Sequence, residues 1–343
     1  MKFLAVFATV LVLAGCGGGG GNGGSSSTSG GVLVGAGSTF VFPLVAKWIP
    51  DYSKRHGVTI TYGPIGSGGG IQQITNRTVD FGASDAPLTQ DQHSACKGCL
   101  QIPWALAGTS IPYNLSGAPK HLRLTGQVIA DMFLGKVKAW NDPAIAKLNP
   151  GAKLPSVAVT PVYRTDSSGT TYNFTDYLSR VSPEWRSKVG TGTSVNFPAG
   201  AGAKGSSGVA AALSRAQGAI TYIDAAYSIE NGFSYASLQN RAGKYTLPDR
   251  AAVAAAAQTL ATVPPDNAVS IVDPPASAPA AYPLSTFTYA IVPQKTGKAA
   301  LLKPFLAYAI GPGQQFAPQL QFADLPPKIL AADKATIAKI TKQ

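Results

Sequence analysis

The sequence predicts an α/β protein built from two domains. Short runs of β-branched and aromatic residues alternate with segments of helical periodicity, which is the pattern of strand–helix units. About 310 residues follow the N-terminal region, more than one hydrophobic core usually serves. Hydrophobic residues make up 45% of the chain and charged residues 13%, a composition typical of a folded globular protein.

Residues 1–16 predict export and a lipid anchor. Lys2 supplies a positive charge, and residues 3–14 form an apolar run that is too short to span a bilayer. The run ends in Leu-Ala-Gly-Cys, which resembles the bacterial lipobox, where the cysteine (here Cys16) becomes the lipidated first residue of the mature protein. Residues 1–15 are therefore expected to be a signal peptide. The alternatives are an ordinary secretory signal cleaved nearby, or a buried cysteine.

A tether and then the globular body follow. Residues 17–31 are almost entirely Gly and Ser, so residues 16–31 are expected to form a lipidated cysteine and a flexible tether. The tether would reach roughly 20 Å. The rest of the chain holds no apolar stretch of transmembrane length. Anchoring would therefore depend on lipid alone.

The first part of the body reads as strands alternating with helices. Residues 32–34 predict a strand, and the apolar spacing that follows predicts a helix with Pro43 in its first turn. Pro50 is expected to kink or end this helix. Further along, the pattern predicts strands at 58–62 and 79–81 and a short helix at 71–76.

The same alternation continues to the C-terminus. Strands are predicted at 157–163, 219–223 and 287–292, and helices at 174–181, 209–213 and 329–340. Residues 264–283 are rich in Pro and Ala and predict a loop that leads into a strand.

Cys96 and Cys99 predict a small structural disulfide. A redox pair or half of a zinc site has the same spacing. However, there is no second cysteine pair, and His93 is the only neighbouring ligand type. The other histidines, His56 and His121, stand apart from it, so no metal site and no cofactor are expected.

The charge of the chain favours an anionic partner but not a nucleic acid. The formal net charge is +12, yet the Lys and Arg residues are scattered singly, without a basic run or stripe. Nucleic-acid recognition modules leave a clustered basic footprint. The predicted export argues further against such a partner.

Four segments combine Gly, Ser, Thr and charged residues. They are residues 35–40 (GAGSTF), 66–70 (GSGGG), 80–85 (DFGASD) and 164–170 (RTDSSGT). Three of them join a strand to a helix N-terminus, where free N–H groups and the helix dipole favour an anion. An arginine adds a bidentate charged fork. For any one segment alone, simple helix capping is the alternative.

Together these segments resemble the phosphate-binding protein of the bacterial phosphate-specific ABC importer, a substrate-binding lipoprotein of the two-domain periplasmic binding-protein class. The resemblance includes residues 133–142 (FLGKVKAWND) and 144–151 (AIAKLNPG), and it extends from about Val32 to the C-terminal helix. It implies a two-lobed type II (Venus-flytrap) fold with two chain crossovers, near residues 110–113 and 285–288. Lobe I would combine residues 32–110 with 285–343, and lobe II would comprise residues 111–284.

The resemblance also implies the ligands of inorganic phosphate. Asp166 would hold the site arginine in place without being a ligand itself. The eight implied ligands are Thr39, Phe40 (through its backbone N–H), Ser67, Asp85, Arg164, Ser168, Gly169 and Thr170.

Asp85 is expected to select the anion. Phosphate near neutral pH keeps a proton that it can donate to a carboxylate, whereas fully ionised sulfate has none. A site that depends on such a bond discriminates by roughly 10⁴ or more.

The function implied is capture of phosphate between the lobes and delivery to the membrane subunits of an ABC permease, by a monomer anchored on the periplasmic or outer face of the cell membrane. An exported phosphatase and a phosphate-sensing surface lipoprotein are the alternatives. No nucleophile or metal motif supports an enzyme. Residues 200–205 (GAGAKG) fit a dinucleotide fingerprint with Asp224 beyond them, but Pro198 interrupts the approach, and a structural loop before the helix at 209–213 is expected.

Overall fold

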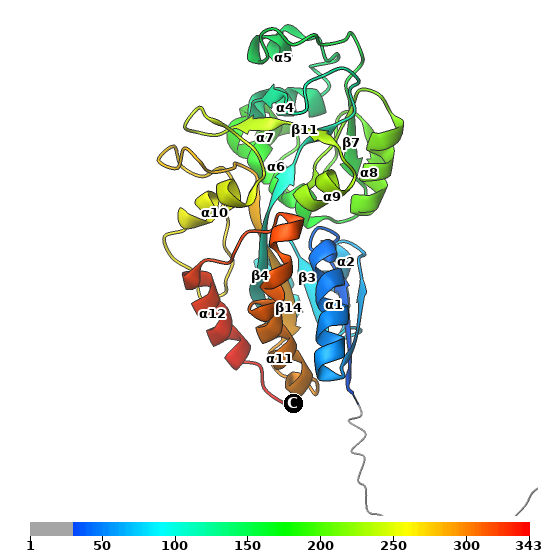
Figure 1. Ribbon diagram of the computed structural model, residues 1–343. Coiled ribbons are helices and arrows are strands. Elements are labelled where there is room, and N and C mark those ends of the chain that lie inside the picture. Colours follow the sequence, from blue (N-terminus) through cyan, green and yellow to red (C-terminus); the bar gives the residue numbers. More distant parts are fainter. Residues whose placement is uncertain (1–29) are drawn as a thin grey trace, which may run out of the picture.

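The computed structural model of the protein describes residues 30–343, so the predicted signal peptide and Cys16 lie outside the described residues. These residues form two α/β bodies stacked along the long axis of the molecule (Figure 1). We call the body built on a six-stranded sheet lobe I and the other body lobe II. None of the described helices is long and apolar enough to cross a membrane.

Lobe I is organised around a mixed sheet. Strands β1, β2 and β3 are parallel, and β14 runs antiparallel between β3 and the long strand β4. In order across the sheet, its strands are β10 (Ile223–Asp224), β4 (Cys99–Ser110), β14 (Ser285–Pro293), β3 (Phe81–Ser84), β1 (Val32–Gly37) and β2 (Thr59–Gly63). The helices of this body are α1 (Phe42–His56), α2 (Ser67–Thr75), α3 (Gln90–Ala95), α11 (Ala299–Ala309) and α12 (Pro327–Ala338).

Lobe II carries a five-stranded sheet and a smaller three-stranded one. Across the larger sheet lie β11 (Ser234–Tyr235), β5 (Pro112–Tyr113), β9 (Ala219–Ile220), β7 (Thr160–Arg164) and β8 (Ala201–Ala203). The smaller sheet has β13 (Tyr245–Thr246), β12 (Ser237–Gln239) and β6 (Arg123–Leu124). The helices are α4 (Gly126–Phe133), α5 (Pro143–Leu148), α6 (Gly169–Val181), α7 (Pro183–Lys188), α8 (Gly205–Arg215) and α9 (Ala225–Glu230).

Each lobe has its own large apolar core. In lobe I the rings of Trp48 and Trp104 meet edge to face at 5.2 Å, and both are fully buried. In lobe II the rings of Phe174 and Tyr222 stack at 4.2 Å. Each fully buried large apolar side chain contributes roughly 1.5–3 kcal/mol, so each body has the means to hold its half of an interlobe site rigid.

The chain passes between the lobes through two neighbouring strands of the first sheet, β4 and β14. Strand β4 ends at Ser110 in lobe I, and β5 begins two residues later in lobe II. The chain returns in β14. Before that return, α10 (Arg250–Gln258) packs Val253, Ala256 and Ala257 into the lobe I core. This part of the segment predicted for lobe II therefore lies against lobe I, and the predicted lobe limits stay a prediction.

The elements that the sequence predicts lie within a few residues of observed ones, although many other strands and helices were not predicted, and the two-lobed α/β fold is confirmed. Pro50 was expected to kink or end the helix. The helix does not end there, because α1 continues to His56. The turn beyond Pro50 is held by packing. Tyr52 is buried there, and its ring centroid lies 5.3 Å from that of Phe305 and 5.0 Å from that of Tyr308. Tertiary contacts here outweigh the hydrogen bond that proline removes.

Cys96 and Cys99 form a disulfide with a Cα–Cα distance of 5.5 Å. The two residues are buried in a small cluster with Ile71 and Ile74 of α2. Arg77, just beyond α2, directs its guanidinium at both sulfurs and donates to the carbonyl of Cys96 at 2.7 Å. The disulfide therefore supports the C-terminal end of a helix whose N-terminus carries Ser67.

Candidate anion-binding site

Four helix N-termini converge where the lobes meet. Helices α1 and α2 belong to lobe I, and α6 and α8 belong to lobe II. A helix leaves the N–H groups of its first turn without intrahelical partners, and its dipole places partial positive charge there. Contacts between Thr39 and Ser206, and between Gly68 and Ser167, join the ends across the boundary. The arrangement concentrates hydrogen-bond donors in one place.

The lobe I half of the site centres on a buried carboxylate. Asp85 follows β3 and is 1% exposed. Its Oδ1 accepts a hydrogen bond from the Ser38 hydroxyl, and its Oδ2 lies 3.4 Å from the Ser67 hydroxyl. Gly70 lets α2 approach closely, since a Cβ there would lie 2.5 Å from the Cα of Gly37. This close packing sets Ser67 beside Asp85.

Thr39 and Phe40 stand at the entrance of α1. Thr39 is 6% exposed, and its Oγ1 lies 2.8 Å from the hydroxyl of Ser206 in lobe II. The Phe40 ring packs in the lobe I core. Its backbone N–H, predicted as an anion donor, donates to the Ser38 hydroxyl at 3.0 Å in this structure. An anion would have to share or replace that hydrogen bond.

The lobe II half holds the cation of the site. Arg164 ends β7 and is 5% exposed. It forms a bidentate pair with Asp166, donating from Nε to Oδ1 at 2.7 Å and from Nη2 to Oδ2. The same Oδ1 accepts the backbone N–H of Gly205, the first residue of α8, at 2.9 Å. Asp166 thus fixes both the guanidinium and a helix N-terminus, and its role in supporting an anion ligand stays a prediction.

Ser168, Gly169 and Thr170 form the start of α6. Ser168 caps the helix, since its Oγ accepts the N–H of Thr171 at 3.2 Å. The cap leaves the hydroxyl proton of Ser168 free to be donated, so capping and anion binding are compatible. The Oγ1 of Thr170 is buried without a hydrogen-bond partner. Thr170 also lowers the pKa of Asp85, so its hydroxyl lies on the side of that carboxylate, where it can donate to an anion.

The lobes touch closely at the site. The N–H of Gly68 donates to the carbonyl of Ser167 at 2.9 Å, and Asn173 Nδ2 donates to the carbonyl of Asp85 at 2.7 Å. A Cβ on Gly169 would lie 2.6 Å from the backbone nitrogen of Asp85 and 2.7 Å from Ser67 Oγ. Only glycine permits this approach, so the two lobes are in direct contact at the site.

The charges of the site are unevenly compensated. Burial raises the pKa of Asp85 to about 6, although the Ser38 hydroxyl, Arg164 and the Ser67 hydroxyl each lower it. Burial also raises the pKa of Asp166, but Arg164 and the N–H of Gly205 outweigh it, and the pKa of that carboxyl is lowered overall. At pH 8 one guanidinium therefore faces two carboxylates. An anion would be held by hydrogen bonds and helix dipoles instead of net positive charge.

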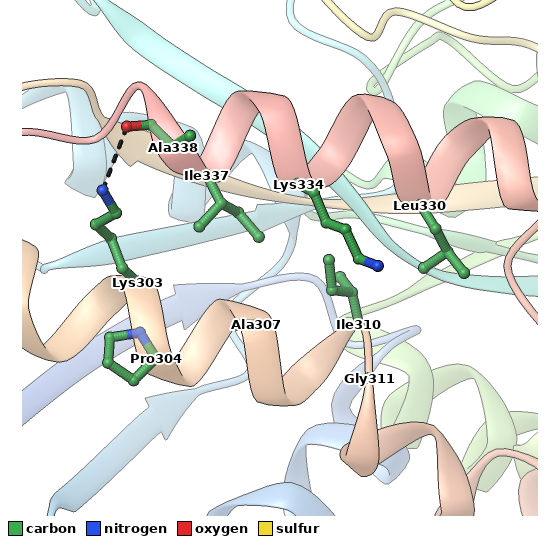
Figure 2. Close-up of a pocket in the computed structure, with 9 residues that line it drawn as sticks. All are labelled: Lys303, Pro304, Ala307, Ile310, Gly311, Leu330, Lys334, Ile337 and Ala338. Atoms are coloured by element: carbon green, nitrogen blue, oxygen red, sulfur yellow. Dashed lines mark hydrogen bonds between the residues drawn. The ribbon is translucent and has the colours of Figure 1, made fainter.

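A hollow of about 350 Å³ opens at the mouth of the site. It is lined from lobe I by Thr39, Phe42 and Ile65, and from lobe II by Lys204 and Tyr227, among others. Another hollow, of about 610 Å³, lies elsewhere, between α11 and α12 of lobe I (Figure 2). Its walls are mostly apolar, and Lys303 there donates to the carbonyl of Ala338 at 3.2 Å. It has none of the anion donors described above.

Sequence reasoning missed three residues of the site. Ser38 lies within a predicted segment but was not singled out, and Asn173 lies inside a helix with no motif around it. Ser206 was missed because residues 200–205 were expected to be a loop. In the structure they form β8 and the start of α8, which corrects that expectation.

The dinucleotide fingerprint has another explanation. Asp224 caps α9, since its Oδ1 accepts the N–H of Tyr227 at 3.0 Å. Among the described residues, no group of three or more His, Cys, Asp or Glu side chains is placed to hold a metal ion.

Comparison with known proteins identifies relatives over most of the chain. The profile of the PBP superfamily domain matches residues 23–312. The phosphate-binding protein PstS of Xylella fastidiosa is 42% identical over 300 residues, covering 86% of this chain and 82% of the relative. The PstS protein of Pasteurella multocida is 40% identical, with 87% of each chain covered. A substrate-binding protein of a phosphate ABC transporter from Clostridium perfringens, solved with bound phosphate, shares the fold with a TM-score of 0.64 at 18% identity, covering 86% of this chain and all of that one.

Proposed function

The chain belongs to the PBP superfamily and, within it, to the phosphate-binding proteins of the phosphate ABC transporter, and from this premise we propose how it works. It binds inorganic phosphate in the cage between its lobes and delivers it to a membrane ABC permease. The proposed ligands are Thr39, Phe40, Ser67, Asp85, Arg164, Ser168, Gly169 and Thr170, with Asp166 in support.

The observation that carries the proposal is the position of Asp85. The ionised carboxylate of Asp85 can only accept hydrogen bonds. A fully ionised anion would repel it, because such an anion offers only oxygen lone pairs. Phosphate at neutral pH carries a proton and donates it to Asp85, while its other oxygens accept from the helix N-termini. A protonated tetrahedral oxyanion would thus offer a proton to Asp85 and lone pairs to the donors around it.

The pKa of Asp85 gives this selection a pH dependence. The pKa is raised to about 6, so at pH 8 the group is ionised and can only accept hydrogen bonds. As the pH falls through about 6, the carboxyl gains a proton and becomes a donor, which suits sulfate. Discrimination against sulfate should be strong at pH 8 and weaken toward pH 5.

Calorimetric titration with phosphate and sulfate at pH 8 and pH 5 tests the proposal. At pH 8 we expect phosphate to bind at least about 10⁴-fold more tightly than sulfate. Asp85→Asn, whose amide can donate to either anion, should bring the two affinities together. Asp324→Asn, on an exposed side chain of lobe I, is the control and should change neither affinity. Equal affinities of the native protein for the two anions at pH 8 would refute the role of Asp85.

Binding without catalysis separates the proposal from its enzymatic rival. We propose that the protein is not an enzyme, because a phosphatase needs an activated nucleophile or a metal cluster. Turnover of p-nitrophenyl phosphate by the purified protein, with divalent metals added, would contradict this. A surface lipoprotein that only senses phosphate is the other rival, and a deletion strain with unchanged phosphate uptake would favour it.

The protein is further proposed to be an exported monomer, held at the membrane through a lipid on Cys16 and the tether that follows. The support is the order of signal, lipobox cysteine and Gly/Ser segment in residues 1–31. Release of a Cys16→Ser variant from the membrane fraction would agree with this anchor. Closure of lobe I (residues 32–110 and 285–343) onto lobe II (residues 111–284) around phosphate is proposed to create the form that the permease recognises. Small-angle scattering that stays unchanged on adding phosphate would count against closure.

A further inference from the structure

We propose that Ser206 is a positioning residue of the phosphate cage: it orients the hydroxyl of Thr39 toward the anion and fastens lobe II to lobe I in the closed form. The inference rests on the proposed function. It adds a residue from the N-terminus of α8, which contributes none of the proposed ligands. Ser206 is the second residue of α8, and Thr39 lies just before α1, on the opposite side of the cleft.

The contact between the two residues is double and buried. The hydroxyl oxygens of Thr39 and Ser206 lie 2.8 Å apart, and either can be the donor. In addition, the backbone N–H of Ser206 donates to Thr39 Oγ1 at 3.3 Å. Ser206 is 1% exposed and Thr39 6%, so the contact is largely shielded from water.

The chemistry of a hydroxyl gives this contact its consequence. A threonine hydroxyl has one proton to donate and two lone pairs that accept. When the N–H and the O–H of Ser206 both donate to Thr39 Oγ1, both lone pairs are occupied. The single proton of Thr39 must then point elsewhere, and the cage offers the anion as its acceptor. Bound phosphate thus selects one of the two directions that the hydroxyl pair can take.

The position of Ser206 is fixed by the Arg164–Asp166 pair of lobe II. The N–H of the preceding residue, Gly205, donates to Asp166 Oδ1 at 2.9 Å, and Asp166 pairs with Arg164. The first turn of α8 is therefore fixed to the charged pair on one side and to Thr39 on the other. Opening the cleft breaks the Thr39 contact and leaves the Asp166 contact intact, because only the first spans the two lobes.

The test removes the hydroxyl alone. Ser206→Ala keeps the backbone N–H, and we expect phosphate binding to weaken about 3- to 15-fold, the range for loss of one buried hydrogen bond. Most of the loss should appear as faster dissociation, since the contact forms only when the lobes close. Ser214→Ala removes an exposed hydroxyl from the C-terminal part of the same helix, where it donates only to the carbonyl of Ala210, and should leave affinity and kinetics unchanged.

A double-mutant cycle separates positioning from a purely structural role. Thr39→Val removes the hydroxyl that Ser206 is proposed to orient, so adding Ser206→Ala to it should cost almost nothing more. Ser206→Thr restores a hydroxyl and should recover much of the affinity. Additive losses, or native affinity and dissociation rate in Ser206→Ala, would overturn the inference. If the native protein itself fails to bind phosphate in the calorimeter, the proposed function fails instead, so the two failures are distinguishable.

Discussion

The two halves of the cage are built on opposite principles. In lobe II the charge is paired before any anion arrives, because Arg164 is bonded to Asp166 and Asp166 also accepts the N–H of Gly205. In lobe I the carboxylate of Asp85 has hydroxyl donors but no cation of its own. Its compensating charge, Arg164, lies across the cleft and lowers its pKa only partly against burial.

The difference shows what each half contributes. Lobe II offers a rigid set of hydrogen-bond donors that would bind any small oxyanion. Lobe I offers the one acceptor that requires a proton on the anion. Neither half is complete, because the first lacks selectivity and the second repels anions. In the proposed cage, affinity and selectivity would arise only when the lobes close, which would tie recognition of phosphate to the closed shape.

The largest effect is expected from breaking the charged pair of lobe II. Arg164→Gln leaves Asp166 buried without its partner, which costs about 3–5 kcal/mol, and phosphate binding should fall by about 10³-fold or more. Calorimetry and thermal unfolding measure the two losses.

A second variant separates folding from binding. Arg164→Gln/Asp166→Asn removes both charges, so the thermal stability should largely return while phosphate binding stays lost. Phosphate affinity within tenfold of native in the double variant would show that hydrogen bonds from helix ends suffice without the guanidinium.

The next effect concerns closure itself. In Gly169→Ala the added methyl would lie within 3 Å of Asp85 and Ser67 atoms, so the lobes cannot reach their closed distance. We expect phosphate affinity to fall about 100-fold with little change in melting temperature, because each lobe core is untouched. Gly208→Ala is the matched control, since a Cβ there meets only Ala203 at 3.7 Å, an ordinary contact. Equal affinities of the two variants would argue that the lobes need not approach so closely.

Much of the site could be predicted from the sequence because its residues lie at strand–helix junctions. Gly, Ser and Thr at such places have a local meaning, and Arg164 and Asp166 fall within one such segment. Ser206 was not predicted, because the glycine-rich segment before it was expected to be a loop. Only the pairing of β8 with β7 shows that this segment contains a strand. Asn173 escaped because a polar residue inside a helix acquires its role from a partner 88 positions away.

The fold was predictable to a similar degree and for similar reasons. The parallel strands of lobe I and the helices between them follow from local periodicity. Strand β4 was not predicted, because nearly all of its 12 residues are buried and no alternation marks it. The packing of α10 against lobe I was equally invisible, since it depends on a long-range contact rather than on any local pattern.

A buried carboxyl of lobe I outside the site, Asp333, is expected to have no effect on binding, which sharpens the contrast with Asp85. Asp333 of α12 is fully buried, and neither of its carboxyl oxygens has a hydrogen-bond partner. Burial raises its pKa to about 9. The unfolded chain releases this proton near pH 4 and the folded chain near pH 9, so folding stability falls as the pH rises between these values.

Asp333→Asn removes that linkage. The variant should be about 1–4 kcal/mol more stable than the native protein at pH 8 and nearly equal to it at pH 4.5, with phosphate affinity unchanged. Denaturant unfolding at the two pH values measures the difference, and Asp324→Asn, on an exposed side chain, should show none of it. If Asp333→Asn gained no stability at pH 8, the carboxylate would have to be solvated or paired in solution. Asp85 is buried to a similar extent but has the Ser38 and Ser67 hydroxyls as donors, so that outcome would mean that these donors are not what distinguishes the two carboxyls.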